Sequence, residues 1–367
     1  MRIERLQLIN FRNYAYQELR LHPLLNLILG ENAQGKTNLL ESVYVAARGS
    51  SFKNVSDRQL IRFGERSAYV RADIESENRK KAVEVKFSMV EKKRVRINEV
   101  ELENLKELTN QFECVLFAPE DLELVKGGPG QRRDYLDDLL GGIARSYPSL
   151  EKQYQKILFQ RNQLLKGRKD SWFSSQMEAY DQQLAHAALP LLRYRKGICG
   201  ELARFARDFH QRLTEKQEQL QIHYRSNAME GDRLPKEEEL LQRLQASRSR
   251  DLQFGNTDIG PHKDDIEIVI NGVDARRFAS QGQCRTVTLS LKLAELKALE
   301  AHNERKPILL LDDVFSELDQ NRCQTLLETV KGYQTIITAN QLDDTIQAEQ
   351  FMGRFLVKQG KIRTLER

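Results

Sequence analysis

The sequence predicts an α/β fold whose main lobe is assembled from both ends of the chain, with a mostly helical second domain inserted between them. Strand-like runs crowd the two ends, whereas residues 131–249 are rich in helix formers and almost lack strand patterns. A glycine and proline cluster at residues 126–130 marks the change of character. The 367 residues suffice for about two domains. We therefore expect one lobe from residues 1–125 and 255–367 and an insertion over residues 126–254.

The N-terminal part contains four elements of this lobe. Residues 2–9 alternate polar and apolar side chains, which predicts a strand with one buried face. Residues 24–29 form a short apolar run typical of a fully buried strand, and a helix is expected at residues 38–47. Residues 81–89 and 94–97 are expected to be two strands of a meander.

The inserted segment is expected to form long helices, for which an antiparallel pair is one arrangement. Leu, Gln, Glu, Lys and Arg dominate it, and no proline lies between Pro148 and Pro190 or between Pro190 and Pro235. Residues 227–235 are expected to form a loop within it.

The α/β character returns after Gly255. The Asn271-Gly272 pair follows the alternating residues 266–270, which predicts a hairpin with a type I′ turn. A helix is expected at residues 286–301. The remaining expected strands lie at residues 308–311, 334–338, 355–357 and 361–365. The first two are apolar enough for a parallel sheet, and the last two are expected to form a second hairpin around Gln359-Gly360.

Composition excludes several classes of protein. Hydrophobic residues make up 40% and charged residues 30%, which excludes a mainly disordered chain. No apolar run reaches the roughly 18 residues that cross a bilayer, and the alternating N-terminus does not resemble a signal peptide. The four cysteines form no Cys-x-x-Cys pair, so neither a zinc site nor a disulfide framework is indicated. We expect a cytoplasmic protein with no membrane partner, and the net charge of +5 permits a polyanionic ligand.

Residues 30–37 match the phosphate-binding pattern G-x-x-x-x-G-K-[ST] and lie between an apolar strand and a helix. Glycines let successive N–H groups point at phosphate oxygens, and the helix N-terminus adds positive charge. Lys36 can reach the β- and γ-phosphates, and the Thr37 hydroxyl can ligate Mg²⁺. We therefore expect ATP and Mg²⁺ here. The predicted ATP-binding residues of this segment are Gly30, Glu31, Asn32, Ala33, Gln34, Gly35, Lys36, Thr37 and Asn38.

A buried strand that ends in two carboxylates supplies the second half of the predicted site. Asp312 and Asp313 follow the apolar residues 308–311, and nucleotide hydrolases hold their metal with such an acid. Asp312 is the expected Mg²⁺ ligand, and Asp313 is expected to accept a proton from the attacking water. Together with Lys36 they are the predicted catalytic residues. A strand that merely ends in a polar turn is the alternative.

These motifs, separated by nearly the whole chain, resemble those of the RecF family of ABC-type ATPases, a group that includes the SMC proteins. The resemblance extends over essentially the full length and includes residues 8–14, 32–41 and 118–133. Residues 311–319 look like the acidic strand and the loop that follows it. The fold it implies is an ABC-type ATPase head interrupted by an insertion.

A second motif, Ser280-Gln281-Gly282-Gln283, looks like the signature of this superfamily. The resemblance implies that Ser280, Gln281, Gly282 and Gln283 act in trans, on the γ-phosphate of a nucleotide bound to a second copy. Considered alone, the same four residues could be a polar helix cap.

The resemblance also implies that Arg12 and Asn13 contact the nucleotide. Two departures from transporter ATPases stand out: Asp313 replaces a glutamate, and no histidine follows the next strand. Thr338 or Asn340 could sense the γ-phosphate instead. Slow ATP hydrolysis, an ATP-dependent homodimer, and binding of duplex DNA and of single-strand/double-strand junctions are implied. RecO and RecR are the implied partners, in loading RecA during gap repair and replication-fork maintenance.

Basic residues in the insertion are candidate DNA contacts, because no acidic residue lies between residues 152 and 169. The candidates are Lys152, Lys156, Arg161, Lys166 and Arg168. A solvated helix face is the alternative. Two other functions remain open at this stage: a nucleotide-gated scaffold with incidental DNA contact, and an ABC-type ATPase of another system.

Overall fold

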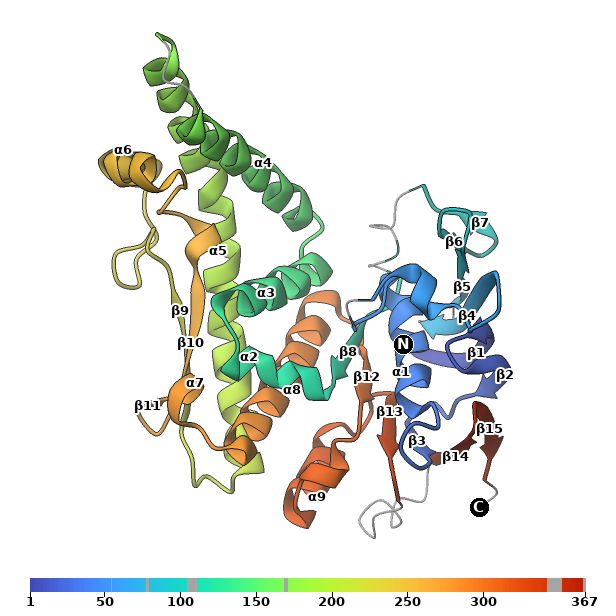
Figure 1. Ribbon diagram of the computed structural model, residues 1–367. Coiled ribbons are helices and arrows are strands. Elements are labelled where there is room, and N and C mark those ends of the chain that lie inside the picture. The colour runs from blue at the N-terminus through green and yellow to red at the C-terminus, as the bar shows by residue number, and fades with distance from the viewer. Residues whose placement is uncertain are drawn as a thin grey trace. The chain divides into compact units, whose positions relative to one another are not determined.

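Figure 1 shows a computed structural model of the chain, which describes residues 1–53, 55–76, 79–103, 108, 111–167, 171–341 and 352–365. The chain divides into two compact units. The first unit comprises residues 1–121, 212–216 and 295–367, and the second comprises residues 122–211 and 217–294.

The first unit contains a mostly parallel six-stranded sheet. Its strand order is β15-β14-β3-β13-β12-β8, and only β15 runs antiparallel to its neighbour. Because β3, β13 and β12 are parallel neighbours, their carboxyl ends lie at one edge of the sheet. The strands are β3 (Leu25–Leu29), β8 (Cys114–Phe117), β12 (Ile308–Leu311), β13 (Thr335–Ala339), β14 (Met352–Lys358) and β15 (Lys361–Thr364).

A second sheet of the first unit is an antiparallel meander in the order β2-β1-β4-β5-β6-β7. Its strands are β1 (Arg2–Phe11), β2 (Tyr14–Arg20), β4 (Ser67–Ser76), β5 (Arg79–Ser88), β6 (Arg94–Ile97) and β7 (Val100–Glu101). Helix α1 (Lys36–Arg48) contacts β4 and β5 of this sheet and β8 and β13 of the parallel sheet. Its apolar side chains, such as Leu40 and Val43, are therefore buried in one core with both sheets. Helix α9 (Gln320–Thr329) belongs to the same unit.

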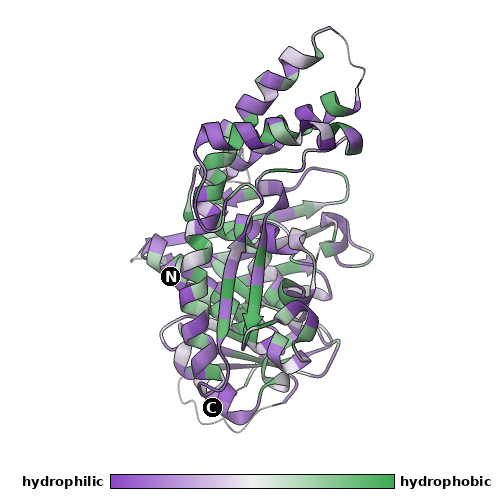
Figure 2. Ribbon diagram, turned by 90° about the vertical axis from the view of Figure 1, so that its left-hand side faces the viewer, coloured by the Kyte–Doolittle hydropathy of each residue, from purple (hydrophilic) through white to green (hydrophobic). Residues whose placement is uncertain are grey.

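The second unit combines helices with a three-stranded antiparallel sheet in the order β11-β10-β9. The strands are β9 (Leu220–Arg225), β10 (Asp265–Ile270) and β11 (Val273–Asp274). The helices are α2 (Glu123–Lys126), α3 (Pro129–Ile143), α4 (Tyr147–Lys166), α6 (Glu237–Phe254) and α7 (Ala275–Phe278), with most of α5 (Phe173–Leu213) and of α8 (Gln281–Asn303). In Figure 2 the long helices alternate between hydrophilic and hydrophobic colours, as expected for helices with one packed and one exposed face.

The predicted α/β class is confirmed, and both predicted hairpins are present. Asn271 and Gly272 have φ values of 51° and 79°, which are the left-handed values that a type I′ turn requires. Gln359 and Gly360 join β14 to β15 with φ values of 50° and 69°.

The predicted boundary at residue 255 is wrong for the compact units, because residues 255–294 group with the second unit. Strand β9 explains the difference. It was not predicted, and β10 pairs with it along its whole length, from Asp265 opposite Arg225 to Ile270 opposite Leu220. The other boundary lies after Asp121, close to the predicted residue 125. Among the described residues, no helix is both long and apolar enough to cross a membrane.

Candidate functional site

The phosphate loop, residues 30–37, connects the buried strand β3 to α1. Lys36 lies inside it: the ammonium donates hydrogen bonds to the carbonyl oxygens of Gly30 at 2.6 Å and Glu31 at 3.0 Å. It also donates to Asn340 Oδ1 at 2.7 Å, from the end of β13. Burial lowers the pKa of Lys36, and the carboxylates of Asp313 and Asp312 oppose that shift. A cation is thus held ready at the position where the pattern predicts phosphate.

Asp312 lies directly opposite Thr37, as the sequence predicted for a metal site. The Thr37 hydroxyl lies 3.0 and 2.9 Å from the two carboxylate oxygens of Asp312, and the Thr338 hydroxyl donates to Asp312 Oδ1 at 2.7 Å. Asp312 is only 6% exposed. A hydroxyl and a buried carboxylate are hard oxygen ligands that fit Mg²⁺, which takes few protein ligands when phosphates supply the rest. The described residues contain no cluster of three or more His, Cys, Asp or Glu side chains suited to a metal.

Asp313 differs from its neighbour in having an unused oxygen. Its backbone N–H donates to Thr338 Oγ1 at 2.9 Å, so one threonine links both aspartates. Its φ of 53° is left-handed, a conformation that aspartate tolerates better than most residues. Within the described part of the chain, Asp313 Oδ1 is buried without a hydrogen-bond partner. Such an atom is costly to keep unless a ligand or water uses it.

Two hairpin turns hold the phosphate loop from outside, and both reach Gln34. From the β1–β2 turn, Asn13 Nδ2 donates to Gln34 O at 2.8 Å, and Tyr14 donates to Gly35 O at 2.8 Å. Burial raises the pKa of Tyr14, so it remains a neutral donor. From the β14–β15 turn, Gln359 N donates to Gln34 Oε1 at 2.7 Å.

The remaining predicted ATP-binding residues lie around this loop. Asn38 Nδ2 donates to Asn13 Oδ1 at 2.9 Å, and Glu31, Asn32 and Ala33 are exposed. A Cβ on Gly35 would lie 2.4 Å from Asn13 Nδ2, which explains the glycine there.

Arg12 faces protein groups in this structure. Its Nε and Nη2 donate to the buried carboxylate of Glu41 at 2.7 and 2.6 Å, and its Nη1 donates to Gln59 O at 2.9 Å. The nucleotide contact implied for Arg12 therefore stays a prediction. The visible role of the side chain is to fix α1 next to the phosphate loop.

The signature segment, residues 280–283, lies in the second unit at the start of α8. Ser280 and Gln283 form a reciprocal cap: Gln283 N donates to Ser280 Oγ at 3.2 Å, and Ser280 N donates to Gln283 Oε1 at 3.0 Å. Gln281 and Gly282 are exposed, and a Cβ on Gly282 would meet no atom within 4 Å. The cap is thus present, and Gln281 and Gly282 remain exposed at the start of α8.

Three of the five candidate DNA contacts are exposed side chains of α4. Lys152, Lys156 and Lys166 are exposed, whereas Arg168 lies outside the described residues. The prediction for Arg161 is wrong, because this side chain is 0% exposed.

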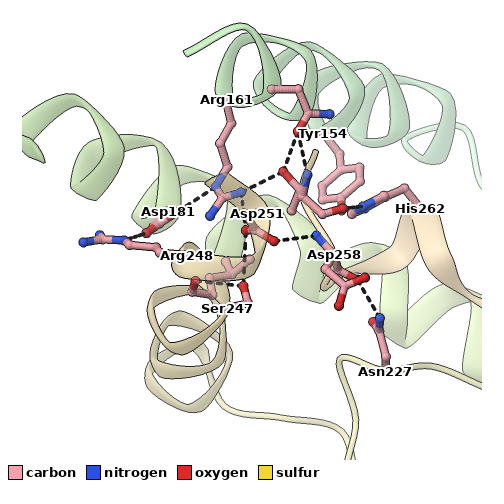
Figure 3. Close-up of polar contacts among 12 residues, drawn as sticks. Tyr154, Arg161, Asp181, Asn227, Ser247, Arg248, Asp251, Asp258 and His262 are labelled. Atoms are coloured by element: carbon pink, nitrogen blue, oxygen red, sulfur yellow. Dashed lines mark hydrogen bonds and ion pairs between the residues drawn. The ribbon is translucent and has the colours of Figure 1, made fainter. Parts of the chain in front are cut away.

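Arg161 instead joins three helices in a buried network (Figure 3). Its Nε donates to Asp181 of α5 at 2.7 Å, and its Nη1 donates to Asp251 of α6 at 2.8 Å. It also donates to Thr257 Oγ1 at 2.8 Å, and Arg248 donates to the other oxygen of Asp181 at 2.6 Å. Removing Arg161 would leave two buried carboxylates short of a cation, which typically costs about 3–5 kcal/mol. Its role is therefore structural.

Comparison with known proteins decides the family. The model described as the RecF/RecN/SMC N terminal domain matches residues 2–363. A DNA replication and repair protein RecF from Alkaliphilus oremlandii is 40% identical over 346 residues, which cover 94% of each chain. Its counterpart from Clostridium botulinum is 37% identical over 99% of this chain and 100% of its own. The chain belongs to the RecF family.

Solved structures of RecF agree with this assignment. One, described as the recombination mediator protein RecF with ATP in the RecFOR pathway, has a TM-score of 0.88 and 34% identity, covering 99% of this chain and 97% of its own. A second, described with ATPrS, has a TM-score of 0.87 and 34% identity over 100% and 98% of the two chains. An Smc head at 14% identity and a TM-score of 0.59 shares the fold alone.

Several site residues were not singled out by the sequence. Tyr14, Gln359 and Gly360 carry no motif of their own, and only the fold brings these turns to the phosphate loop. Thr338 and Asn340 were noted as alternatives, and the geometry separates them: Thr338 binds the aspartates, whereas Asn340 binds Lys36.

Proposed function

We propose that this chain is an ATP-dependent DNA-binding protein of gap repair and replication-fork maintenance, in which ATP joins two copies on DNA and slow hydrolysis releases them. The observation that carries the proposal is the junction of Thr37, Asp312 and Thr338, beside a buried Asp313 oxygen that has no partner among the described residues. Membership of the RecF family supports the biological setting.

The residues have separate roles in hydrolysis. Lys36 exchanges its bonds to Gly30, Glu31 and Asn340 for the β- and γ-phosphate oxygens. Thr37 and Asp312 hold Mg²⁺, which when bound offsets the phosphate charge. Asp313 accepts a proton from the water that attacks the γ-phosphorus, and ADP and phosphate leave. Asn340, released from Lys36, is free to report whether a γ-phosphate is present.

The signature segment completes the site of a second copy. The helix N-terminus of α8, which has no acidic residue in its first turn, and the Ser280 hydroxyl favour an anion, and only ATP places a γ-phosphate there. ATP binding and dimerisation are then one equilibrium, and hydrolysis removes the link. By the same family membership, RecO and RecR are the proposed partners in RecA loading on gapped DNA.

Mass in solution, measured by light scattering with ATP, with ADP and without nucleotide, tests this mechanism. Ser280→Asp and Ser280→Asn are matched variants, because both residues cap helices well and only the aspartate repels phosphate. We expect ATP to convert monomer to dimer for wild type and Ser280→Asn but not for Ser280→Asp. A mass that does not change with ATP would contradict ATP-dependent dimerisation.

A nucleotide-gated scaffold with incidental DNA contact is the second candidate, and an ABC-type ATPase of another system is the third. DNA that stimulates ATP hydrolysis favours the proposed function. Binding of RecR that is equally strong with and without DNA favours the scaffold.

A further inference from the structure

The outermost face of α4 carries lysines and an aromatic side chain in one line. Lys152, Lys156, Phe159, Gln163 and Lys166 follow one another at steps of four, three, four and three residues, which keeps them on one face of a helix. All five are exposed, and Phe159 is 62% exposed. We call these five residues the α4 stripe. The side opposite the stripe contains the buried residues Tyr154, Ile157, Leu158, Arg161 and Leu165.

The stripe has no charge compensation in the described part of the chain. Lys152, Lys156 and Lys166 form no ion pair or hydrogen bond with any described residue. The only acidic residue of α4, Glu151, is half-buried. By contrast, some exposed arginines of this unit are paired, such as Arg225 with Glu267 at 2.5 Å. A polyanion is therefore the ligand whose charge complements this face.

An exposed phenylalanine among lysines favours unpaired bases over duplex. Every base has a flat face that can stack on an aromatic ring, but bases inside a duplex already stack on each other. The stripe extends about 21 Å at the 1.5 Å rise of an α-helix, which is room for several nucleotides at ~3.4 Å each. Phe159 lies two turns from Lys152 and two turns from Lys166, so phosphates on either side of a stacked base meet a lysine.

A second exposed aromatic residue is the sequence neighbour of a glycine that lies against the end of the stripe. A Cβ on Gly255 would lie only 3.2 Å from Lys166 Cγ, which places Lys166 against the C-terminal end of α6. The last residue of α6, Phe254, is 64% exposed. Arg161 locks the two helices together through Asp251, so the stripe is a rigid platform.

We propose that the α4 stripe binds single-stranded DNA, with phosphates on the lysines and a base stacked on Phe159. The proposal rests on the proposed DNA-binding function and gives it a second, strand-specific contact. A protein that binds duplex elsewhere and a single strand on α4 would distinguish a junction from continuous duplex.

Fluorescence anisotropy with the full chain and ATP tests the stripe. The probes are a labelled thymidine strand of about 20 nucleotides, longer than the ~4–16 nucleotides of known single-strand sites, and a duplex of equal length. We expect Phe159→Ala to weaken single-strand binding about 5- to 150-fold, the range for losing one stacking platform, and to leave duplex binding unchanged. Phe159→Trp should restore it. Phe63→Ala, which removes an exposed phenylalanine of the first unit, is the matched control.

The lysines are tested separately, through the salt dependence of single-strand binding. Replacing Lys152, Lys156 and Lys166 together by alanine should lower the slope of log affinity against log salt by about 2, since each phosphate contact on a single strand contributes ~0.7. Unchanged single-strand binding in Phe159→Ala overturns the proposal, as does a loss confined to RecR binding, which would make the stripe a protein-docking face. Wild type that binds duplex but no single strand overturns the stripe alone; wild type that binds neither overturns the proposed function as well.

Discussion

At the scale of single residues, Asp313 has the most specific proposed role, that of the general base in ATP hydrolysis. Asp313→Asn keeps the shape and the backbone bond to Thr338 but removes the proposed proton acceptor. We expect ATP affinity within about twofold of wild type and hydrolysis slowed by roughly 10²–10⁴, the usual contribution of a general base. Phosphate release and equilibrium nucleotide binding, measured side by side, separate the two effects.

Asp57→Asn is the control for Asp313→Asn, because it makes the same chemical change in the same unit. Asp57 is half-buried and pairs with Lys93 at 3.1 Å. Its variant should hydrolyse ATP normally. If Asp313→Asn also hydrolyses ATP normally, the base lies elsewhere.

His262 makes the second unit sensitive to pH. Its Nε2 faces Thr257 O at 2.9 Å and therefore carries the proton, so Nδ1 accepts from Tyr154 at 2.6 Å. Burial lowers the pKa of His262 to about 4, below the 6.5 of a free histidine. The folded state favours the neutral imidazole, so above pH 6.5 the histidine makes its full contribution to the free energy of unfolding. As pH falls from 6.5 through 4, up to roughly 3 kcal/mol is lost.

Asp264, two residues away, acts in the opposite direction. Burial raises its pKa to about 6, so its contribution is present at low pH and is lost as pH rises through 6. Wild type should therefore show little net change from this pair between pH 4 and 6.5. His262→Gln removes the contribution of the histidine and keeps that of Asp264. As pH falls from 6.5 to 4, the free energy of unfolding of the variant relative to wild type should rise by roughly 3 kcal/mol.

Urea unfolding of wild type and His262→Gln at pH 6.5, 5 and 4 measures this difference. Circular dichroism reports the unfolding of the helices that make up much of this unit. All other carboxylates titrate in both proteins and cancel. A gap between the two proteins that stays constant with pH would contradict the assignment.

The sequence predicted which motif residues lie together at the phosphate loop, but it did not predict the contacts of residues outside the motifs. Lys36, Thr37 and Asp312 were predictable because phosphate and metal chemistry restricts which residue types can serve. Arg161 was assigned to DNA because sequence alone does not show burial, and its acidic partners lie 20 and 90 residues away.

At the scale of elements, two turns of the same type provide a matched test of the phosphate-loop support. Gly360 and Gly272 both occupy left-handed positions, with φ of 69° and 79°. A Cβ on Gly272 meets nothing within 4 Å, whereas one on Gly360 would lie 2.4 Å from Asn13 O. Alanine carries the same left-handed penalty of roughly 1 kcal/mol at both sites. Only Gly360→Ala should also displace Asn13 from Gln34.

We therefore expect Gly360→Ala to weaken ATP binding about 10-fold, the effect of losing about one or two hydrogen bonds between uncharged groups. Gly272→Ala should bind ATP as wild type does, with a similar small fall in melting temperature. Equal ATP affinity in the two variants would show that the C-terminal hairpin does not position the loop.

Elements were predictable where one pattern runs long enough. The apolar runs of β3, β12 and β13 were found because parallel buried strands need them. Strand β9 was missed although Leu220, Ile222 and Tyr224 alternate with polar residues. Six residues among helix formers give a weak signal, and what stabilises β9 is its pairing with β10, about 40 residues later.

At the scale of the whole molecule, the two halves of the proposed catalytic site belong to different compact units. The phosphate loop and the aspartates are in the first unit, and the signature segment is in the second. If the signature acts in trans, each site of a dimer takes its phosphate loop from one copy and its signature from the other. A signature that acts in cis would make each copy self-sufficient.

Mixing two inactive variants distinguishes these arrangements. Lys36→Ala removes the phosphate-binding cation and leaves the signature intact, whereas Ser280→Asp does the reverse. In a trans dimer of one of each, the intact phosphate loop meets the intact signature at one of the two sites. Neither variant is expected to pair with itself on ATP, so the dimers that form are mixed, and an equal mixture should regain hydrolysis, up to about half of the wild-type rate. In a cis arrangement no combination restores a site, and the mixture should stay as inactive as its components.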